Sequence, residues 1–375
     1  MIYVARTDTS ILGRWWWTVD RWTLAALIGL MGFGTVLIMA VSPAAASRIG
    51  GLATFQLAQR QMVFLILALA LMVAISLLDV RCVRRLAVLG MAGCLVLLSA
   101  TLMIGPEIKG STRWLSLGGF SVQPSEFVKP CFAVTLAWML ACQKTNSDVP
   151  GQWIGTGLWL ALVVLLLAQP DVGQTFVVTA IWGLQLFMAG LPLALVGMLA
   201  ALGALSLIGA YFFFPHFTAR IDSFLDADAG NRYQIERSME AFTKGGLLGR
   251  GPGEGSVKAQ LPDAHSDFIF AVAGEELGMV ACLVILGLFA FIVLRGFANL
   301  LQEDNLFILL AGTGLLGQFG LQALINMGST LHLIPTKGMT LPFISYGGSS
   351  MLALAIGMGM VLALTRRRAV PGEII

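Results

Sequence analysis

Residues 22–42 have the sequence WTLAALIGLMGFGTVLIMAVS, which contains no charged side chain. A helix that crosses the hydrocarbon core of a bilayer needs about 20 mostly apolar residues, so this stretch predicts a transmembrane helix. Only 11% of the whole chain is charged, whereas soluble domains carry about 25% charged residues. The sequence therefore indicates an integral membrane protein.

Apolar stretches of similar length recur along the whole chain. They cover residues 22–42, 62–79, 86–104, 126–142, 153–168, 174–190, 192–214, 268–294, 305–327 and 347–364. Because a span in lipid must satisfy its own backbone hydrogen bonds, we expect each stretch to be a helix. The predicted fold is all-α: a polytopic membrane protein of ten transmembrane helices in one domain over residues 1–375. One long outer loop, 215–267, joins spans seven and eight.

The distribution of basic residues predicts the orientation of the chain in the membrane. With ten spans both termini lie on one side, and the short loops there carry eleven Lys and Arg residues against five on the other side. The loop 215–267 is left out of this comparison, because long loops are translocated largely regardless of charge. Since basic residues concentrate in cytoplasmic loops, we expect both termini in the cytoplasm. The net charge of +3 gives no indication of a nucleic acid partner.

Polar residues collect at the ends of the spans on the expected outer side. Charged side chains at or within a membrane are costly, and most of them serve a function. The set comprises Lys109, Arg113, Glu126, Lys129, Asp171, Asp267, His332 and Lys337. The cytoplasmic loops, by contrast, are short and mostly basic. We therefore expect the chemistry of this protein on its outer face.

The long outer loop contains a segment with helical periodicity. Within 231–242, the apolar residues Ile235, Met239 and Phe242 recur at helical spacing among charged residues. This pattern predicts a short amphipathic helix. It would lie either at the membrane interface or as an ordinary surface helix without contact to substrate.

A glycine-rich stretch follows in the same loop. Residues 245–255 have the sequence GGLLGRGPGEG. A nucleotide-binding turn would need a preceding strand and a following helix, and Pro252 interrupts the stretch, so we do not expect a nucleotide. A flexible loop that approaches a diphosphate is the better interpretation, with Arg250 and Lys258 as nearby positive charges.

Three carboxylates mark the start of the eighth span. Asp267 lies directly before it, where Ser266 or Asp267 is expected to cap the helix. A carboxylate held ionised at a helix start also suits a general base or a metal ligand, and these roles are compatible with capping. Glu275 and Glu276 follow eight and nine residues later, too deep to be freely solvated. Each needs a partner, most simply in a structural ion pair, and Lys129 is a candidate.

Five segments of the chain resemble a known family. They are KGSTRWL (109–115), QPSEF (123–127), QPDVG (169–173), AHSDFIFAVAGEELG (264–278) and PTKGMTLPFISYGGSS (335–350). Their order and spacing are similar to those of the SEDS proteins (shape, elongation, division and sporulation), polytopic glycosyltransferases of bacterial cell-wall synthesis. The residues around Lys337 and the tryptophan-rich stretch 13–22 resemble the division-type members more than the elongation-type members.

The resemblance implies a reaction, a place and partners. Such proteins polymerise lipid II, a disaccharide-pentapeptide on undecaprenyl diphosphate, on the outer face of the inner membrane, here at the division septum. They work with a class B penicillin-binding protein, a transpeptidase, among other division-complex membrane proteins and membrane lipid. The family's essential carboxylate corresponds to Asp267. Positions matching Lys109, Glu126, Asp171 and Lys337 are also required in the family, and we expect these four residues to bind substrate.

The chemistry fits the distribution of charges along the sequence. A sugar hydroxyl is the nucleophile, so Asp267 would act as the general base or, alternatively, hold a divalent cation such as Mg²⁺ or Mn²⁺. The leaving diphosphate needs positive charge, for which Lys109, Arg113, Arg250 and Lys337 are the candidates. Two alternatives stay open: a flippase that moves lipid II across the membrane, and an elongation-type polymerase of the same family.

Overall fold

The computed structural model describes residues 10–50, 53–107, 111–117, 120–146, 148–192, 232–335 and 338–366, with isolated residues between 194 and 222. Two predicted site residues, Lys109 and Lys337, lie outside the described residues. The same holds for most of the seventh predicted span, 192–214, and for the first part of the long outer loop.

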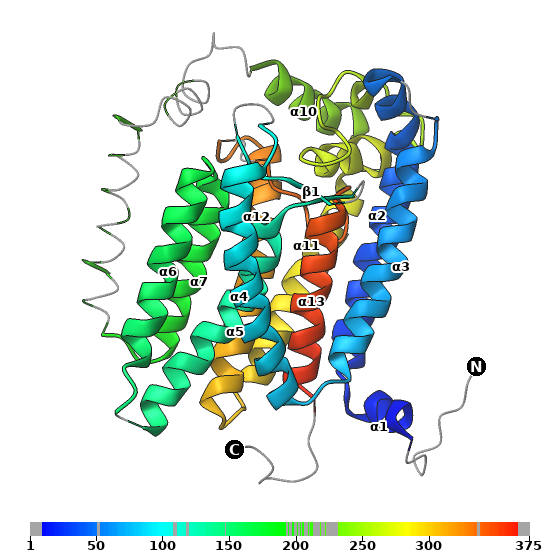
Figure 1. Cartoon of the computed structure of the whole chain (residues 1–375). Helices are drawn as coiled ribbons and strands as arrows, with labels where there is room; N and C mark the ends of the chain where they lie inside the picture. The colour runs from blue at the N-terminus through cyan, green and yellow to red at the C-terminus, as the bar shows by residue number, and fades with distance from the viewer. Residues whose placement is uncertain are drawn as a thin grey trace.

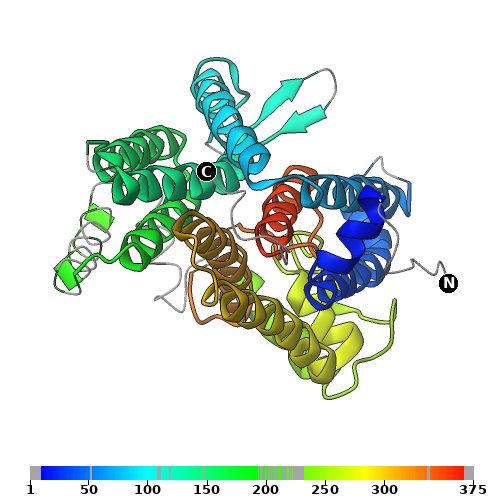
Figure 2. The same ribbon diagram turned by 90° about the horizontal axis from the view of Figure 1, so that it is seen from below.

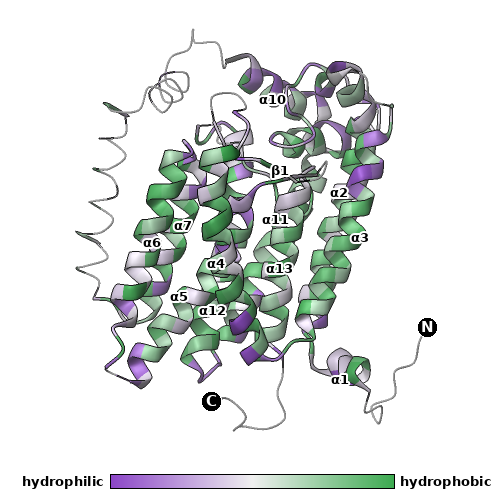
Figure 3. Cartoon of the chain, viewed as in Figure 1, coloured by the Kyte–Doolittle hydropathy of each residue, from purple (hydrophilic) through white to green (hydrophobic). Residues whose placement is uncertain are grey.

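The described chain forms a bundle of long helices that run side by side (Figure 1). These are α2 (Arg21–Ile49), α3 (Gln56–Ser76), α4 (Val80–Ile104), α5 (Pro124–Thr145), α6 (Gly151–Ala168), α7 (Val172–Met188), α11 (Ile269–Leu300), α12 (Leu306–Thr330) and α13 (Gly348–Leu364). Seven of them are long and apolar enough to cross a membrane, and α7 and α13 are shorter apolar helices. Apolar residues cover the middle of the bundle and polar residues gather at its two ends (Figure 3). A multi-pass membrane fold, as predicted from the apolar stretches, is confirmed.

One end of the bundle holds both the first and the last described residues, and we call it the Asp20 end. The short helix α1 (Ile11–Thr18) lies across it, with the Trp15 indole donating to the Ser76 hydroxyl at 2.8 Å. Arg366, after α13, donates to the Thr18 hydroxyl at 3.1 Å. The two ends of the described chain therefore lie on the same side of the bundle.

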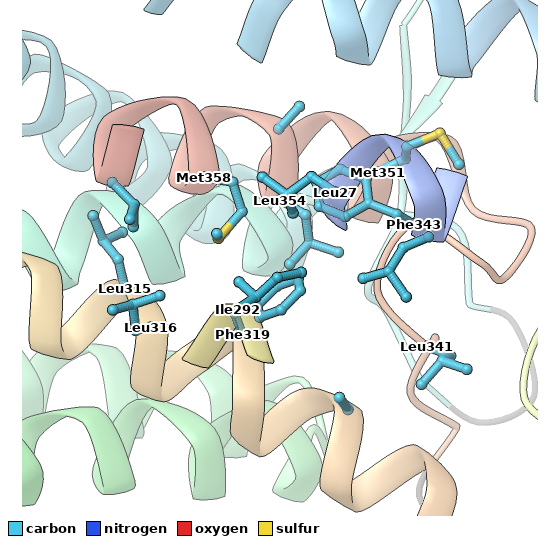
Figure 4. Packing of buried hydrophobic residues seen from close by; sticks show 14 of the residues in the cluster. Leu27, Ile292, Leu315, Leu316, Phe319, Leu341, Phe343, Met351, Leu354 and Met358 are labelled. Carbon is cyan, nitrogen blue, oxygen red and sulfur yellow. The ribbon is translucent and has the colours of Figure 1, made fainter. Parts of the chain in front are cut away.

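The middle of the bundle is an apolar core between α11, α12 and α13. Figure 4 shows Leu27, Ile292, Phe319 and Met358 packed together there. Among the seven helices long enough to cross a membrane, α5 and α12 are the most enclosed, since 72% of the most apolar window of each is buried inside the protein. Polar side chains on these two helices therefore face other protein groups, and they form the site described below.

The opposite end, which we call the Asp267 end, carries the irregular parts of the chain. A short antiparallel hairpin, β1 (Leu115–Leu117) and β2 (Phe120–Val122), projects beside α4 and leads into α5 (Figure 2). The helix predicted over 231–242 is confirmed as α10 (Arg232–Gly245). It packs on α11, where the Phe242 ring meets the Phe270 ring at 5.8 Å. A 3-10 turn, η1 (Val257–Ala259), follows before α11 begins.

The eighth predicted span is not one continuous helix. α11 breaks at Gly278, whose φ of 80° and ψ of −180° lie outside the helical region. Such a conformation suits glycine, because a side chain at positive φ is strained. The break separates Ile269–Leu277, which packs at the Asp267 end, from the longer part of the helix that runs through the bundle.

Candidate active site at the Asp267 end of the bundle

A buried ion pair stands at the start of α5. Glu126 lies in the first turn of α5, where the helix dipole favours a negative charge. Its carboxylate accepts hydrogen bonds from Lys129 Nζ, at 2.9 Å, and from the Gln174 amide of α7. Lys129 Nζ also donates to Gln322 Oε1 of α12 at 3.0 Å. All four side chains are buried. We call them the α5 cluster: they join three helices through polar contacts.

Two further predicted site residues adjoin the α5 cluster. Asp171 caps α7 by accepting from the Gln174 backbone amide at 3.3 Å. Arg113 Nε lies 3.6 Å from Asp171 Oδ2, and its guanidinium donates to the Pro170 carbonyl. The Arg113 side chain is 21% exposed and that of Asp171 is 6% exposed. Three predicted residues, Arg113, Glu126 and Asp171, are therefore brought together by the fold, and Arg113 reaches the surface.

The segment 338–341 links the α5 cluster to Asp267. Gln322 Nε2 donates to the Thr340 carbonyl at 3.2 Å. One turn further along α12, Asn326 Nδ2 donates to the Met339 carbonyl at 2.6 Å and to the Asp267 carbonyl at 2.9 Å. A β-carbon placed on Gly338 would lie 3.5 Å from Asp267 Oδ2, so the carboxylate faces this turn. Asp267 thus belongs to the same polar assembly as Glu126.

The backbone around Asp267 is held by hydrogen bonds. The Asp263 carbonyl accepts from the Asp267 amide at 3.0 Å, and the Ser345 hydroxyl donates to the Ser266 carbonyl at 2.6 Å. Asp267 itself is partly exposed. The predicted capping of α11 by Ser266 or Asp267 is wrong: Phe268 occupies the cap position, and no side chain caps this helix. The side chain of Asp267 is turned toward Gly338 instead.

His265 is the histidine nearest in sequence to Asp267. Burial lowers the pKa of the His265 imidazole, and the nearby Asp263 carboxylate acts in the opposite direction without outweighing it. The ring is therefore neutral at pH 7. It packs beside the Tyr346 ring, 5.7 Å between centroids, which fixes the segment before Asp267 against the turn that follows residue 341.

Several polar atoms of this assembly are not hydrogen-bonded by the protein. Among the described residues, Arg113 Nε, Asp171 Oδ2, Gln174 Oε1 and Asn326 Oδ1 are buried without a hydrogen-bond partner. The 3.6 Å contact of Arg113 with Asp171 is an ion pair but is too long for a hydrogen bond. Buried polar atoms without partners are destabilising and are rare in native proteins. Four of the eleven such atoms among the described residues lie in this assembly, where substrate or water would complete their hydrogen bonding.

A cavity borders the segment that leads to Asp267. It has a volume of about 300 Å³ and lies between the end of α2, at Ala44 and Arg48, and the stretch from Lys258 to His265. Arg48 is exposed and offers a positive charge to this space. The cavity gives an approach from outside to the segment that leads to Asp267.

Arg250 lies apart from the α5 cluster. Its guanidinium is exposed and donates to the Lys244 carbonyl at 3.3 Å and to the Ser256 hydroxyl at 3.4 Å. Its backbone amide bonds to the Glu275 carbonyl at 3.0 Å. Nothing in the described structure places it against Asp267, and its role in binding substrate stays a prediction.

The prediction that Lys129 pairs with Glu275 or Glu276 is wrong, because Lys129 forms its ion pair with Glu126. Lys258 pairs with Glu276 instead. A structural ion pair, the favoured interpretation of these acids, is confirmed for Glu276, with a cation from the long loop, whereas Glu275 is bound by backbone amides. The glycine-rich stretch is not a free loop either, because the amides of Gly253 and Gly255 donate to the Glu276 carboxylate.

Sequence reasoning missed the three amides of the site, Gln174, Gln322 and Asn326. A signal was present, because an amide side chain within an apolar span is costly in lipid and generally finds a partner inside the bundle. Periodicity alone does not show which helices supply that partner.

A divalent cation would fit this site only with help from a substrate. In the part of the chain that the structure describes, no three His, Cys, Asp or Glu side chains gather to hold a metal ion. Mg²⁺ is often bound by one or two carboxylates together with substrate phosphates. Asp267 would be its protein ligand, and the ion would neutralise charge on the phosphates.

Comparisons with known proteins agree with this architecture. The model of the cell cycle protein family that comprises FtsW, RodA and SpoVE matches residues 21–369. A probable peptidoglycan glycosyltransferase FtsW of Caulobacter vibrioides is 46% identical over 364 residues, which cover 97% of this chain and 93% of that protein. A protein of the same name from Escherichia coli O6:H1 is 33% identical, over 92% of this chain and 85% of its own length.

Solved structures show the same fold. One chain of a peptidoglycan synthase complex, described as coordinating polymerization and crosslinking, matches with a TM-score of 0.74 and 29% identity over 92% of this chain and 97% of its own. The rod shape determining protein RodA of Thermus thermophilus matches with a TM-score of 0.68 and 29% identity over 93% of this chain and 97% of its own. The chain therefore belongs to the family of cell cycle proteins that includes FtsW and RodA, the SEDS family.

Proposed function

We propose that this protein is a peptidoglycan glycosyltransferase that polymerises lipid II during cell division. Relatives named as probable peptidoglycan glycosyltransferase FtsW cover nearly the whole chain. The observation that carries the proposal is the polar assembly at the Asp267 end, in which a partly exposed carboxylate adjoins buried polar atoms without partners. Such an arrangement can bind a charged headgroup while its lipid tail remains in the membrane.

In the proposed reaction Asp267 is the general base. Its carboxylate accepts the proton of a sugar hydroxyl on one lipid II as that oxygen bonds to the anomeric carbon of the growing chain. The bond between that carbon and the diphosphate oxygen breaks, and the diphosphate leaves with the electron pair. The partly exposed Arg113 would bind the diphosphate, with Lys109, Lys337 and Arg250 as further cations. Asp171 pairs with Arg113 and caps α7, while Glu126 holds the start of α5 through Lys129 and Gln174.

The tail of the substrate needs a path between helices. Although α3 and α4 are consecutive, α3 packs mainly on α13 and α4 packs mainly on α5. The two helices therefore separate along the bundle. We propose that the polyprenyl chain enters between them, so that its diphosphate reaches Arg113 beside the hairpin.

The ten-span topology is also a proposal, supported by the direction of the described helices. α7 begins with Asp171 at the Asp267 end and runs toward the Asp20 end, whereas α10 lies at the Asp267 end (Figure 1). We propose that the apolar stretch 192–214, between α7 and α10, is a further span. Together with the nine helices named above, this gives ten crossings. Both termini would lie in the cytoplasm and the Asp267 end outside the inner membrane.

A class B penicillin-binding protein is the proposed partner. A similar chain was solved in a peptidoglycan synthase complex whose description names both polymerization and crosslinking. We expect the activity of the purified chain to be low and to rise when the transpeptidase is copurified. Equal activity with and without that partner would count against this proposal.

Purified protein in nanodiscs, supplied with lipid II, tests the function directly. The proposal predicts glycan strands, separated by gel electrophoresis, that are absent from empty nanodiscs. The same protein in sealed vesicles should not move lipid II between leaflets faster than empty vesicles do. Translocation without any polymerisation, measured with and without the transpeptidase, would identify a flippase and overturn the proposal.

A further inference from the structure

The break in α11 is filled by the glycine-rich part of the long loop. At a helix break, backbone groups on both sides lose their partners and must find others. Here the Glu275 and Glu276 carbonyls accept from the amides of Arg250 and Gly251 at 3.0 and 2.9 Å. Beyond the break, the Met279 amide donates to the Gly246 carbonyl at 2.9 Å. The loop thus replaces the hydrogen bonds that the helix lacks.

The two adjacent glutamates bind the same loop through their side chains. Glu275 Oε1 accepts from the amides of Ser256 and Val257, both at 2.7 Å, and its Oε2 accepts from the Lys258 amide at 3.0 Å. Glu275 is 0% exposed and Glu276 is 1% exposed. Two buried carboxylates without donors would be very unfavourable, so these bonds are essential to the local fold.

Glu276 binds the same loop through both of its carboxylate oxygens. Its carboxylate accepts from the Gly255 amide at 3.2 Å, from the Gly253 amide and from Lys258 Nζ. All four oxygens of the acid pair are therefore engaged by residues 253–258. We call residues 253–258 the strap.

The glycines of this loop allow its close approach to the acids. A β-carbon on Gly255 would lie 2.6 Å from Glu276 Oε1 and 2.8 Å from Glu275 Oε2, which is closer than real contacts permit. Gly249 has a φ of 78°, and a β-carbon there would collide with the Glu276 carbonyl. The loop that the sequence predicted to approach a diphosphate thus contacts the protein's own Glu276 carboxylate.

The strap leads directly into the segment that carries Asp267. Val257 accepts from the amides of Gln260 and Leu261, and Asp263 accepts from the Asp267 amide, so successive turns connect the strap to Asp267. The strap is therefore linked through two successive turns to Asp267, whose carbonyl is also held by Asn326 of α12.

We propose that Glu275 and Glu276 are positioning residues for glycosyl transfer: through the strap they fix the place of the Asp267 carboxylate. This inference rests on the proposed role of Asp267. Neither acid contacts the substrate; their contribution is to hold the strap against the broken helix. Misplacement of a catalytic group by about 1 Å can lower a rate roughly 100-fold, so a small movement of the strap is enough.

The test compares Glu275→Gln with Glu254→Gln in nanodiscs containing lipid II and the transpeptidase. Glu254 is an exposed acid within the strap and is the matched control. In the wild type both carboxylate oxygens of Glu275 accept hydrogen bonds from backbone amides. In Glu275→Gln one of these oxygens is replaced by an NH2 group, which faces amide donors and cannot accept from them. We expect kcat to fall at least about 10-fold with KM within about twofold. Glu254→Gln should behave as the wild type.

Hydrogen exchange provides the second readout. In Glu275→Gln, amides of residues 253–267 should exchange at least about tenfold faster while those of α12 keep their wild-type protection. Gly255→Ala, which pushes the strap away without changing any charge, should reproduce both effects if Glu275→Gln does not fold. A wild-type kcat in both variants, or a lowered kcat with unchanged exchange over 253–267, would overturn the inference.

The outcome is separable from that of the proposed function. If the wild type makes strands, Asp267→Asn makes none and Glu275→Gln matches the wild type, only the positioning role is wrong. If the wild type makes no strands under any of these conditions, the proposed function itself fails.

Discussion

Two buried polar clusters at the Asp267 end handle their charges in different ways. The α5 cluster joins Glu126 and Lys129 to amide side chains from α7 and α12. The second cluster, formed by Glu275, Glu276 and Lys258, binds mainly backbone amides of the strap. The first links separate helices, and the second folds one stretch of chain onto the helix that follows it.

The two clusters differ in how many of their polar atoms lack a hydrogen-bond partner. The four carboxylate oxygens of Glu275 and Glu276 are all occupied, so that cluster has no capacity for a ligand. Beside the α5 cluster, in the described residues, Arg113 Nε and Asp171 Oδ2 lack hydrogen-bond partners. We infer that a cluster whose polar atoms are all hydrogen-bonded holds neighbouring residues in place, whereas a cluster with unpaired polar atoms can bind substrate. This comparison separates the residues expected to meet substrate from those expected to hold the site in shape.

The largest expected effect comes from breaking the ion pair of the α5 cluster. Lys129→Met leaves the Glu126 carboxylate buried without its cation, and removal of one partner of a buried pair costs about 3–5 kcal/mol. The free energy of unfolding, followed by denaturant titration of the purified protein, should fall by that amount. The double variant Lys129→Met/Glu126→Gln removes both charges and should recover part of the loss. A single variant as stable as the wild type would show that the pair is not essential to the fold.

Asp267→Asn should abolish chemistry without unfolding the protein. The amide keeps the size of the carboxylate but cannot take up a proton at neutral pH, so we expect polymerisation to fall at least about 100-fold. Strand synthesis per folded molecule is the measurement, with thermal unfolding as the control. If the variant retained the wild-type rate, Asp267 would not be the base.

Arg113→Ala tests whether the unpaired atoms beside the α5 cluster bind substrate. Hydrogen bonds to charged groups contribute about 1.5–3 kcal/mol, so loss of this guanidinium should raise KM for lipid II roughly tenfold or more. Initial rates at several lipid II concentrations give the value. The strap variant Glu275→Gln should leave KM nearly unchanged. An unchanged KM in Arg113→Ala would remove Arg113 from the substrate site.

The smallest effect is expected at the opposite end of the bundle. Asp20 caps α2 and forms a two-point contact with Arg295 of α11, at 2.7 and 2.9 Å. Because the Arg295 side chain is one-third exposed, Asp20→Asn should cost only about 1 kcal/mol of stability. Polymerisation per folded molecule should not change, which a parallel assay of strand synthesis would show. A large loss of activity would mean that the two ends are coupled.

The sequence predicted the helical membrane fold well, because apolar length and amphipathic spacing are local properties. The stretches that became α2, α10 and α12 follow these patterns directly. The break at Gly278 was not predicted, because a single glycine within an apolar run is usually tolerated in a helix. Its position depends on the loop that fills it, which is a tertiary contact.

The sequence predicted several residues of the candidate site, but it did not predict which of them contact one another. Arg113, Glu126 and Asp171 were selected as costly charges, and the fold brings them together. The assignment of Lys129 to Glu275 failed because depth along two helices does not show which of them are neighbours. For the same reason the glycine-rich stretch was interpreted as a diphosphate loop, although its amides bind Glu276 of the next helix.

The central claim is that lipid II is bound between Asp267 and Arg113 at the outer end of the bundle. The most direct measurement is a cryo-electron microscopy structure of Asp267→Asn in nanodiscs with lipid II and the transpeptidase. The account predicts ordered sugar and diphosphate within hydrogen-bond distance of residue 267 and of the Arg113 guanidinium. An ordered headgroup at the Asp20 end, or one bound against the strap and away from both residues, would contradict it.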